Sequence, residues 1–231
     1  MGERPHADAR SDSPEPRSGR DLSAMRRDYG DGALVEAEMA ADPLEQFRRW
    51  LDDAVAAGVP EPNAMVLATA DANGTPSART VLLKSVDDRG LTFYTNLESA
   101  KAADLAVRPV AAVVFPWHAM ARQVRVTGGV TEVDRAEVAA YFASRPWESQ
   151  LGAVVSRQSR VIPDRATLDR EYAAAEARWP RGTAIPVPDY WGGYRIRPEM
   201  FEFWQGRKGR LHDRIRYRKV NDQWVMERLA P

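Results

Sequence analysis

Three side chains between residues 141 and 149 could bind a phosphate monoester. Tyr141, Arg145 and Ser149 recur at four-residue intervals, which places them on one helix face if the helix continues. Pro146 interrupts that helix, so we expect Ser149 to lie after a break. A phenol, a guanidinium and a hydroxyl all donate to phosphate, and the guanidinium can bind two oxygens at once. A helix end with a solvated arginine explains the same spacing, because surface arginines are common.

A basic run near the C-terminus is a second candidate. It holds seven bases within thirteen residues: Arg207, Lys208, Arg210, Arg214, Arg216, Arg218 and Lys219. The run fits either a nucleic-acid surface or a solvated strand face. If it is a strand, Arg210, His212 and Arg214 share one face and Leu211 points the other way. Neighbouring arginines lower the pKa of a histidine, and a neutral imidazole among cations suits an anionic aromatic ligand.

The segment ARTVLLKS (78–85) has the pattern of a strand that carries Arg79 and Lys84 around an apolar centre. Alternation places the two cations on opposite sides, so both reach one ligand only if a bulge or strand end turns one of them. Two exposed charges on a barrel strand are the alternative. Trp204 could pack against a flat cofactor, whereas we expect most of the seven tryptophans to lie in the core.

Composition argues against several kinds of site. The chain has no cysteine, which excludes disulfides, thiolate metal sites and a cysteine nucleophile. Its three histidines are scattered and no HExxH motif is present, so we expect no transition-metal site. Lys+Arg and Asp+Glu both number 33, and this balance argues against bulk nucleic acid or an anionic membrane as the main partner. No apolar stretch fits a membrane span or a signal peptide, so we expect a cytoplasmic protein.

The elements that position these residues are short and closely connected. Residues 1–24 are rich in Pro, Ser, Arg and Asp, and we expect a disordered tail before one domain over 25–231. Asp42 as N-cap and Pro43 at the first helical position predict a helix that ends at Gly58 and Pro60. Further helices are expected near 99–107, over 134–146 and over 166–179. Strands are expected over 64–70, 77–86, 91–96, 110–117, 122–130, 193–198, 201–206, 210–220 and 221–231.

Such short connections require antiparallel pairing, and closing the sheet into a barrel removes its exposed edges. The predicted fold class is α+β, an antiparallel barrel with peripheral helices. An Asn73-Gly74 hairpin signal between the first two strands agrees with this arrangement.

From about Met25 to Pro231 the chain resembles the pyridoxamine 5′-phosphate oxidase family, which belongs to the FMN-binding split-barrel group. The blocks that carry the resemblance occur in order along the chain. They are RRDY (26–29), RTVLLK (79–84), FYTN (93–96), FPW (115–117), RQV (122–124), YFASRP (141–146), SRQS (156–159), EFWQG (202–206), RLHDR (210–214) and the terminal ERLAP. One block alone would be weak evidence, but the whole ordered set is highly specific.

The resemblance implies an FMN site built by two subunits of a homodimer, with two such sites at the interface. The positions that match FMN contacts are Arg79, Thr80, Val81, Leu82, Leu83, Lys84, Tyr94, Thr95, Lys101, Gln123, Gln158, Ser159, Trp204 and Arg214. The family often has Ser-Arg-Lys where this chain has Ser99-Ala100-Lys101. One charge-assisted contact is then missing, which corresponds to about 1.5–3 kcal/mol if nothing replaces it.

For the substrate, the resemblance implies a phosphate clamp of Lys84, Tyr141, Arg145 and Ser149. Arg210, Leu211 and His212 match the segment that holds the pyridine ring, with Arg210 and His212 as the candidate catalytic residues. We expect His212 to position the substrate as a hydrogen-bond donor more than to act as a base. Arg26 and Tyr29 match a segment that closes over the site.

The implied reaction is oxidation of pyridoxamine 5′-phosphate and pyridoxine 5′-phosphate to pyridoxal 5′-phosphate. Oxygen is the implied electron acceptor and hydrogen peroxide the implied product. The alternatives are a split-barrel flavin or deazaflavin-dependent reductase, a non-catalytic protein that binds pyridoxal 5′-phosphate or flavin, and a nucleic-acid-binding barrel that uses the basic run.

Overall fold

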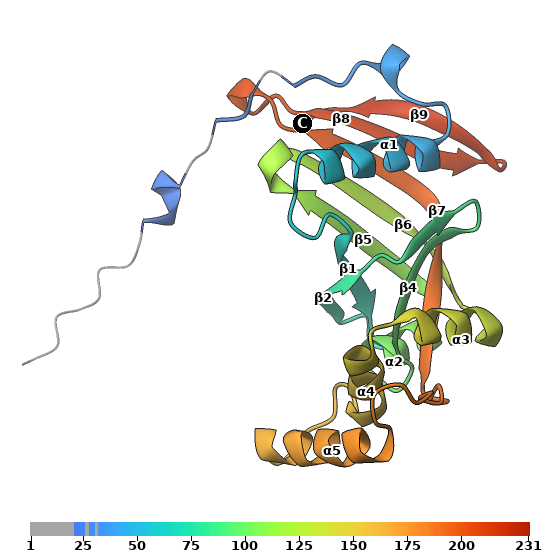
Figure 1. Cartoon of the computed structure of the whole chain (residues 1–231). Helices are drawn as coiled ribbons and strands as arrows, with labels where there is room; N and C mark the ends of the chain where they lie inside the picture. The colour runs from blue at the N-terminus through green and yellow to red at the C-terminus, as the bar shows by residue number, and fades with distance from the viewer. Residues whose placement is uncertain (1–20, 26–27, 31) are drawn as a thin grey trace, which may run out of the picture.

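A computed structural model describes residues 21–25, 28–30 and 32–231. Within these residues, one antiparallel nine-stranded sheet curls into a half-barrel, with the α-helices of residues 100–178 gathered at one end and the helix of residues 43–56 against the sheet toward the other (Figure 1). This is the predicted α+β split barrel, with the sheet left open between its end strands. The expected tail falls mostly on residues 1–20, which lie outside the described residues, as does Arg26. The described part of the tail includes a 3₁₀ turn at Leu22–Ala24.

The strands follow the order β2-β1-β5-β6-β7-β4-β3, with β8 paired to β7 and β9 paired to β8. Their bounds are β1 Ala64–Ala70, β2 Pro76–Leu82, β3 Ser85–Asp87, β4 Gly90–Asn96, β5 Val110–Trp117, β6 Arg122–Glu132, β7 Trp191–Gln205, β8 Asp213–Val220 and β9 Gln223–Leu229. The α-helices are α1 Pro43–Ala56, α2 Ala100–Val107, α3 Arg135–Ser144, α4 Trp147–Val155 and α5 Arg165–Arg178. In the described part of the chain, no helix is long and apolar enough to cross a membrane.

Helix α1 begins where the sequence predicts and covers one face of the sheet. The Asp42 carboxylate accepts a hydrogen bond from the backbone N–H of Leu44, which caps the first turn. Its buried side includes Phe47 and Trp50. The Phe47 ring lies 4.8 Å from the ring of Phe115, and the Trp50 ring lies edge-on to that of Phe203 at 5.2 Å. These aromatic contacts anchor the helix to the main core.

The long strand β7 is the axis of the sheet. The two strands expected over 193–198 and 201–206 are one strand of 15 residues. Its first part pairs with β4 and its last part with β8, while β6 runs along most of its length. At ~3.3 Å per residue, its two ends are separated by up to roughly 45 Å. Groups at the two ends of β7 therefore cannot contact one small ligand within the same chain.

The strand expected over 77–86 is interrupted, which corrects the sequence prediction. β2 pairs with β1, and β3 pairs with β4. At the crossing, the backbone N–H of Leu83 donates to the carbonyl of Asn63, and that of Lys84 donates to the carbonyl of Thr92, both at 2.8 Å. The chain thus changes partner strands between these two residues, so alternation no longer relates Lys84 to Arg79.

The strand expected over 210–220 begins only at Asp213, because residues Lys208–Arg210 form a 3₁₀ turn. The prediction that Arg210 and His212 share a strand face with Arg214 was therefore wrong. The break predicted at Pro146 is confirmed, since α3 ends at Ser144 and α4, which carries Ser149, begins at Trp147.

Candidate active site

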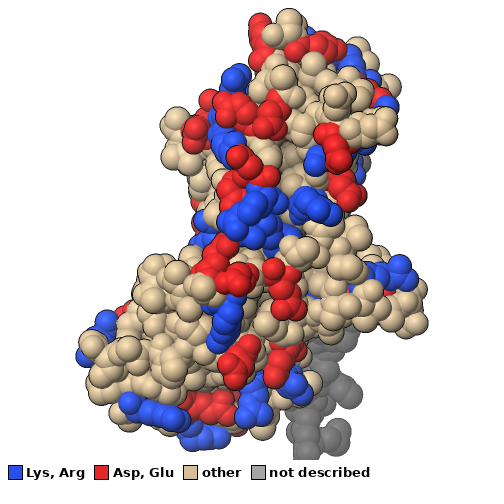
Figure 2. All heavy atoms as spheres, turned by 90° about the vertical axis from the view of Figure 1, so that its right-hand side faces the viewer, with Lys and Arg blue, Asp and Glu red and all other residues tan. Residues whose placement is uncertain are grey.

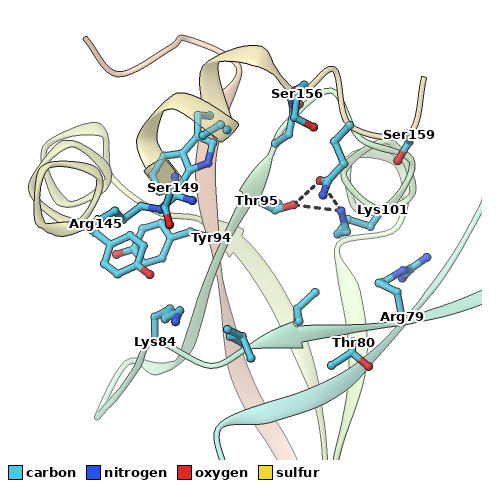
Figure 3. Close-up of a pocket in the computed structure, with 18 of the residues that line it drawn as sticks. Arg79, Thr80, Lys84, Tyr94, Thr95, Lys101, Arg145, Ser149, Ser156 and Ser159 are labelled. Carbon is cyan, nitrogen blue, oxygen red and sulfur yellow. Dashed lines mark hydrogen bonds between the residues drawn. The ribbon is translucent and has the colours of Figure 1, made fainter. Parts of the chain in front are cut away.

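An open cavity of about 1140 Å³ lies between β2, β4, α2 and the α3–α4 pair, beside the start of β7 (Figure 3). It collects most of the residues singled out from the sequence. These are Arg79, Thr80, Val81, Leu82, Lys84, Tyr94, Thr95, Lys101, Tyr141, Arg145, Ser149, Gln158 and Ser159. Leu83 does not line the cavity, because its side chain is buried in the main core.

The charged side chains that line the cavity all carry positive charge. Its lining includes four cationic side chains, those of Arg79, Lys84, Lys101 and Arg145, and none of the described lining residues is acidic. In Figure 3 the Arg79 and Lys101 side chains lie at one side, and those of Lys84 and Arg145 lie at the other. A cavity with two separated pairs of cations favours a ligand set with two anionic groups.

Lys101 is buried without a carboxylate partner in the described structure. Its ammonium donates to the Gln158 Oε1 at 2.8 Å, and to the hydroxyls of Thr95 and Ser99 at 3.1 Å each. Burial, followed by the charge of Arg79, lowers the pKa of Lys101 to about 8. A buried ammonium with only neutral acceptors is poised to bind an anion.

The backbone beside Lys101 adds further donors. The N–H of Ala100, at the start of α2, donates to the Ser159 hydroxyl at 3.2 Å. Ser159 has a left-handed backbone with φ of 72°, a conformation that is uncommon for a non-glycine residue. This turn holds the α4–α5 connection against the start of α2, where the helix dipole also favours negative charge.

Polar side chains hold the Arg79 guanidinium in place at the cavity. Its guanidinium donates to the Thr69 hydroxyl at 2.7 Å and the Ser77 hydroxyl at 2.6 Å. The Asp104 carboxylate lies 3.9 Å from the same guanidinium and accepts from Thr69. Because the chain changes partner strands between Leu83 and Lys84, Lys84 lines the same cavity as Arg79. Both cations of the 78–85 segment can therefore face one ligand.

The opposite side of the cavity is aromatic and cationic. The rings of Tyr94 and Tyr141 stack with centroids 4.0 Å apart, and the Trp191 ring is nearly parallel to both. The Arg145 guanidinium lies over the Trp191 ring at 4.8 Å. Burial lowers the pKa of Arg145 and raises that of Tyr141, since each loses hydration in its charged form.

A second group of predicted residues lies at the other end of β7. The His212 ring is 4.7 Å from that of Trp204 and 5.3 Å from that of Tyr29. Arg210 lies over the Tyr29 ring at 5.6 Å, whereas Leu211 is 72% exposed. Gln123, Trp204 and Arg214 lie side by side across β6, β7 and β8.

The His212 ring has a defined hydrogen-bonding role. The backbone N–H of Arg207 donates to its Nδ1 at 3.1 Å, so a neutral His212 carries its proton on Nε2. The pKa of His212 is lowered, as predicted, but the larger cause is burial, and of the two arginines named from the sequence only Arg210 contributes its charge. The ring can therefore offer Nε2–H as a donor near neutral pH.

Ion pairs neutralise much of the basic run. Arg207 pairs with Asp213, Arg214 with the buried Glu202, and Arg216 and Arg218 both with Glu227. On the face drawn in Figure 2, basic and acidic side chains are intermingled. These pairs support the interpretation as a solvated strand face over the nucleic-acid interpretation.

Sequence reasoning missed two residues of the cavity side. Trp191 lies in the core as expected of most tryptophans, but it also lines the cavity, and Ser99 is the buried acceptor that helps to hold Lys101. The role of Trp191 depends on the pairing of β4 with β7, which no local sequence pattern predicts. Ser99 carried a weak signal, since it is a hydroxyl residue directly in front of a predicted helix, where such residues are preferred.

Comparisons with known proteins agree with this geometry. Residues 51–178 match the family described as "Pyridoxamine 5'-phosphate oxidase", and residues 191–231 match the "Pyridoxine 5'-phosphate oxidase C-terminal dimerisation region". A pyridoxine/pyridoxamine 5′-phosphate oxidase from Salinispora arenicola is 54% identical over 209 residues, covering 90% of this chain and 95% of the relative. One from Frankia alni is 50% identical over 231 residues, covering 98% and 93%.

A solved structure is also similar over most of the chain. PhzG from Burkholderia lata, determined with tetrahydrophenazine-1-carboxylic acid, has a TM-score of 0.82 at 30% identity and covers 87% of this chain and 99% of its own. The family matches and the curated relatives cover both the cavity and the C-terminal strands. The chain therefore belongs to the pyridoxamine 5′-phosphate oxidase family of oxidoreductases.

Proposed function

We propose that this protein uses FMN to oxidise pyridoxamine 5′-phosphate and pyridoxine 5′-phosphate to pyridoxal 5′-phosphate, with oxygen as acceptor and hydrogen peroxide as product. The observation that carries the proposal is the pair of cation groups in a cavity whose described lining has no acidic residue. The cofactor and the substrate each end in a phosphate monoester. Two separate phosphate sites in one cavity match that pair of molecules.

The Lys101 side of the cavity fits the cofactor phosphate. Lys101, Arg79, Thr95 and Ser159 would hold it, because they combine two cations with two hydroxyls near a helix N-terminus. The donor set also explains why a lysine is buried without a carboxylate. When bound, the flavin supplies the two-electron oxidation, and the protein supplies binding and orientation.

The Arg145 side fits the substrate phosphate. Lys84, Tyr141, Arg145 and Ser149 offer two cations and two hydroxyls, and the Arg145 Nη1 is a buried donor without a partner in the described structure. A phosphate held there is remote from the carbon that reacts. Its binding energy can fix the orientation of the ring and so raise the rate of the chemical step.

The remaining residues require a second subunit. Gln123, Trp204, Arg210, His212 and Arg214 lie at the far end of β7, too distant to meet a ligand in the cavity of their own chain. A two-fold dimer would place that end of one chain at the cavity of its partner. There Arg210 and the Nε2–H of His212 would position the substrate ring.

Aerobic turnover of the FMN-loaded protein tests the reaction. Pyridoxamine 5′-phosphate and pyridoxine 5′-phosphate are supplied separately, and aldehyde and hydrogen peroxide are followed together. We expect both products in equal amounts. Bound FMN with no aldehyde from either substrate would contradict the proposal and favour a split-barrel reductase or a ligand carrier.

Subunit complementation tests the shared site. Arg145→Met and Arg210→Met each alter one end of the chain, so each homodimer should be nearly inactive. If the site is shared, a mixed dimer has one site with both changes and one site with neither. Random exchange should then restore about a quarter of wild-type activity. No recovery after exchange, verified by a tagged subunit, would show that both residues act in the same chain.

A further inference from the structure

The Arg145 guanidinium packs over the indole ring of Trp191. The Arg145 Cζ lies 4.8 Å from the centre of the indole, within the range of a cation–π contact. Trp191 lines the cavity but is only 5% exposed, so this contact is largely shielded from water. Desolvation strengthens such contacts. The ring is therefore a substantial part of the surroundings of Arg145.

No carboxylate in the described structure pairs with Arg145, and its Nη1 is buried without a hydrogen-bond partner. Long arginine side chains have many rotamers, and fixing one costs conformational entropy. A carboxylate could fix the side chain, but it would occupy the in-plane N–H donors and cancel the charge. An aromatic face attracts the cation from below and leaves those donors free.

The Trp191 ring is itself held firmly. It lies nearly parallel to Tyr94, at an interplanar angle of 4°, and Phe142 meets it edge-on at 4.9 Å. The Trp191 carbonyl accepts from the Arg135 guanidinium at 2.8 Å. Two strand residues further on, Gly193 leaves room for Tyr94, because a Cβ there would lie 2.7 Å from the Tyr94 ring.

We propose that Trp191 is a positioning residue for phosphate selectivity, which holds Arg145 through its ring face so that the guanidinium stays free to bind the substrate phosphate. The proposal rests on the proposed function. It assigns to Trp191 a role in selectivity for phosphorylated over non-phosphorylated substrates.

The test compares pyridoxine 5′-phosphate with pyridoxine, and uses Trp191→Leu, which removes the ring face, and Trp191→Phe, which keeps a smaller one. We expect Trp191→Leu to lower kcat/KM for the phosphorylated substrate by about 2- to 30-fold, and Trp191→Phe by less. With pyridoxine, kcat/KM should change by less than about twofold, since no phosphate is bound. A purely structural role would lower both values together.

The same comparison in an Arg145→Met background completes a double-mutant cycle. If Trp191 acts through Arg145, Trp191→Leu should then change kcat/KM for pyridoxine 5′-phosphate by less than about twofold. An equal loss in both backgrounds, or an equal loss for both substrates, would overturn the proposal. If Trp191→Leu does not fold, the cycle with Trp191→Phe decides in the same way.

Trp224→Leu is the matched control, because Trp224 also lies under a cation, Lys219, but does not line the cavity. It should leave the ratio of the two kcat/KM values unchanged. If the wild-type protein oxidises neither substrate, the proposed function itself has failed. If it oxidises both and the cycle is additive, only the role of Trp191 has failed.

Discussion

Replacing Lys101 with methionine should separate ligand binding from stability. The change removes a buried ammonium that no described carboxylate balances, and leaves an apolar chain of similar length. If the cation serves an anionic ligand, its loss should weaken FMN binding and barely affect the folded apoprotein. If it serves the fold, the apoprotein should suffer instead.

The structure sets the size of both effects. A hydrogen bond to a charged group contributes about 1.5–3 kcal/mol, so the FMN dissociation constant should rise by about 10- to 150-fold. Burial holds the pKa of Lys101 at about 8 instead of 10.5, which corresponds to a cost of about 3 kcal/mol for the folded ammonium. The variant is relieved of that cost. It leaves the hydroxyl oxygens of Thr95 and Ser99 without their Lys101 donor, which costs a similar amount, while the Gln158 Oε1 keeps the hydrogen bond from the Thr95 hydroxyl.

The two terms nearly cancel, so the free energy of unfolding of the apoprotein should change by less than about 1 kcal/mol. FMN fluorescence titration gives the dissociation constant, and urea unfolding of the apoprotein gives the stability. Arg108→Met is the control, because it removes an exposed cation at the other end of the same helix. A loss of about 3 kcal/mol or more in apoprotein stability with unchanged FMN affinity would refute the reasoning.

Three further predictions concern pH, a substitution that adds charge and one that adds bulk. FMN affinity should be full below about pH 8 and fall as Lys101 loses its proton, while the Lys101→Met variant shows a flat profile in titrations from about pH 7 to about pH 9. Across the window from 8 to 10.5, the unfolded chain binds more protons than the folded chain, so apoprotein stability should rise with pH there. Ala100→Arg should lower the FMN dissociation constant by about tenfold, because it adds a guanidinium at the cavity; unchanged or weaker binding by fluorescence titration would count against the phosphate site. Gly206→Ala would place a Cβ 2.6 Å from the Tyr29 ring and should lower the free energy of unfolding by about 1–3 kcal/mol. Urea unfolding should show a smaller loss in a Tyr29→Ala background, and equal losses would mean that the two residues do not meet.

Elements with local signals could be predicted from the sequence. Asp42 and Pro43 mark the start of α1 because a cap and a fixed φ act on neighbouring backbone. Asn73-Gly74 marks the turn between β1 and β2, where Gly74 has a φ of 85°. The gathering of Arg79, Lys101 and Arg145 in one cavity came from the resemblance, because their spacing in the chain carries no such information.

Elements that depend on distant partners could not be predicted in this way. The break after Leu82 arises because Asn63, just before β1, and Thr92, on β4, bind consecutive backbone groups. The contact of Trp191 with Tyr94 follows from a register that joins strands about a hundred residues apart. The turn before His212 did have a local signal, since Gly209 has a positive φ, but the alternating pattern after it was extended too far back.

The long strand β7 also affects how the chain can fold. β4 ends at Asn96, but its partner strand β7 begins only at Trp191. The β4–β7 pairing, which completes the cavity wall, therefore joins residues with one of the longest sequence separations in the sheet. During synthesis at about 5–20 residues per second, the intervening residues take roughly 5–20 s to appear. β4 presents an unpaired edge throughout that interval, and β6 does so once it has been made, and another chain could occupy either edge. The nascent chain is thus most prone to aggregation just before its last strands emerge, and chaperone binding should be strongest at that stage.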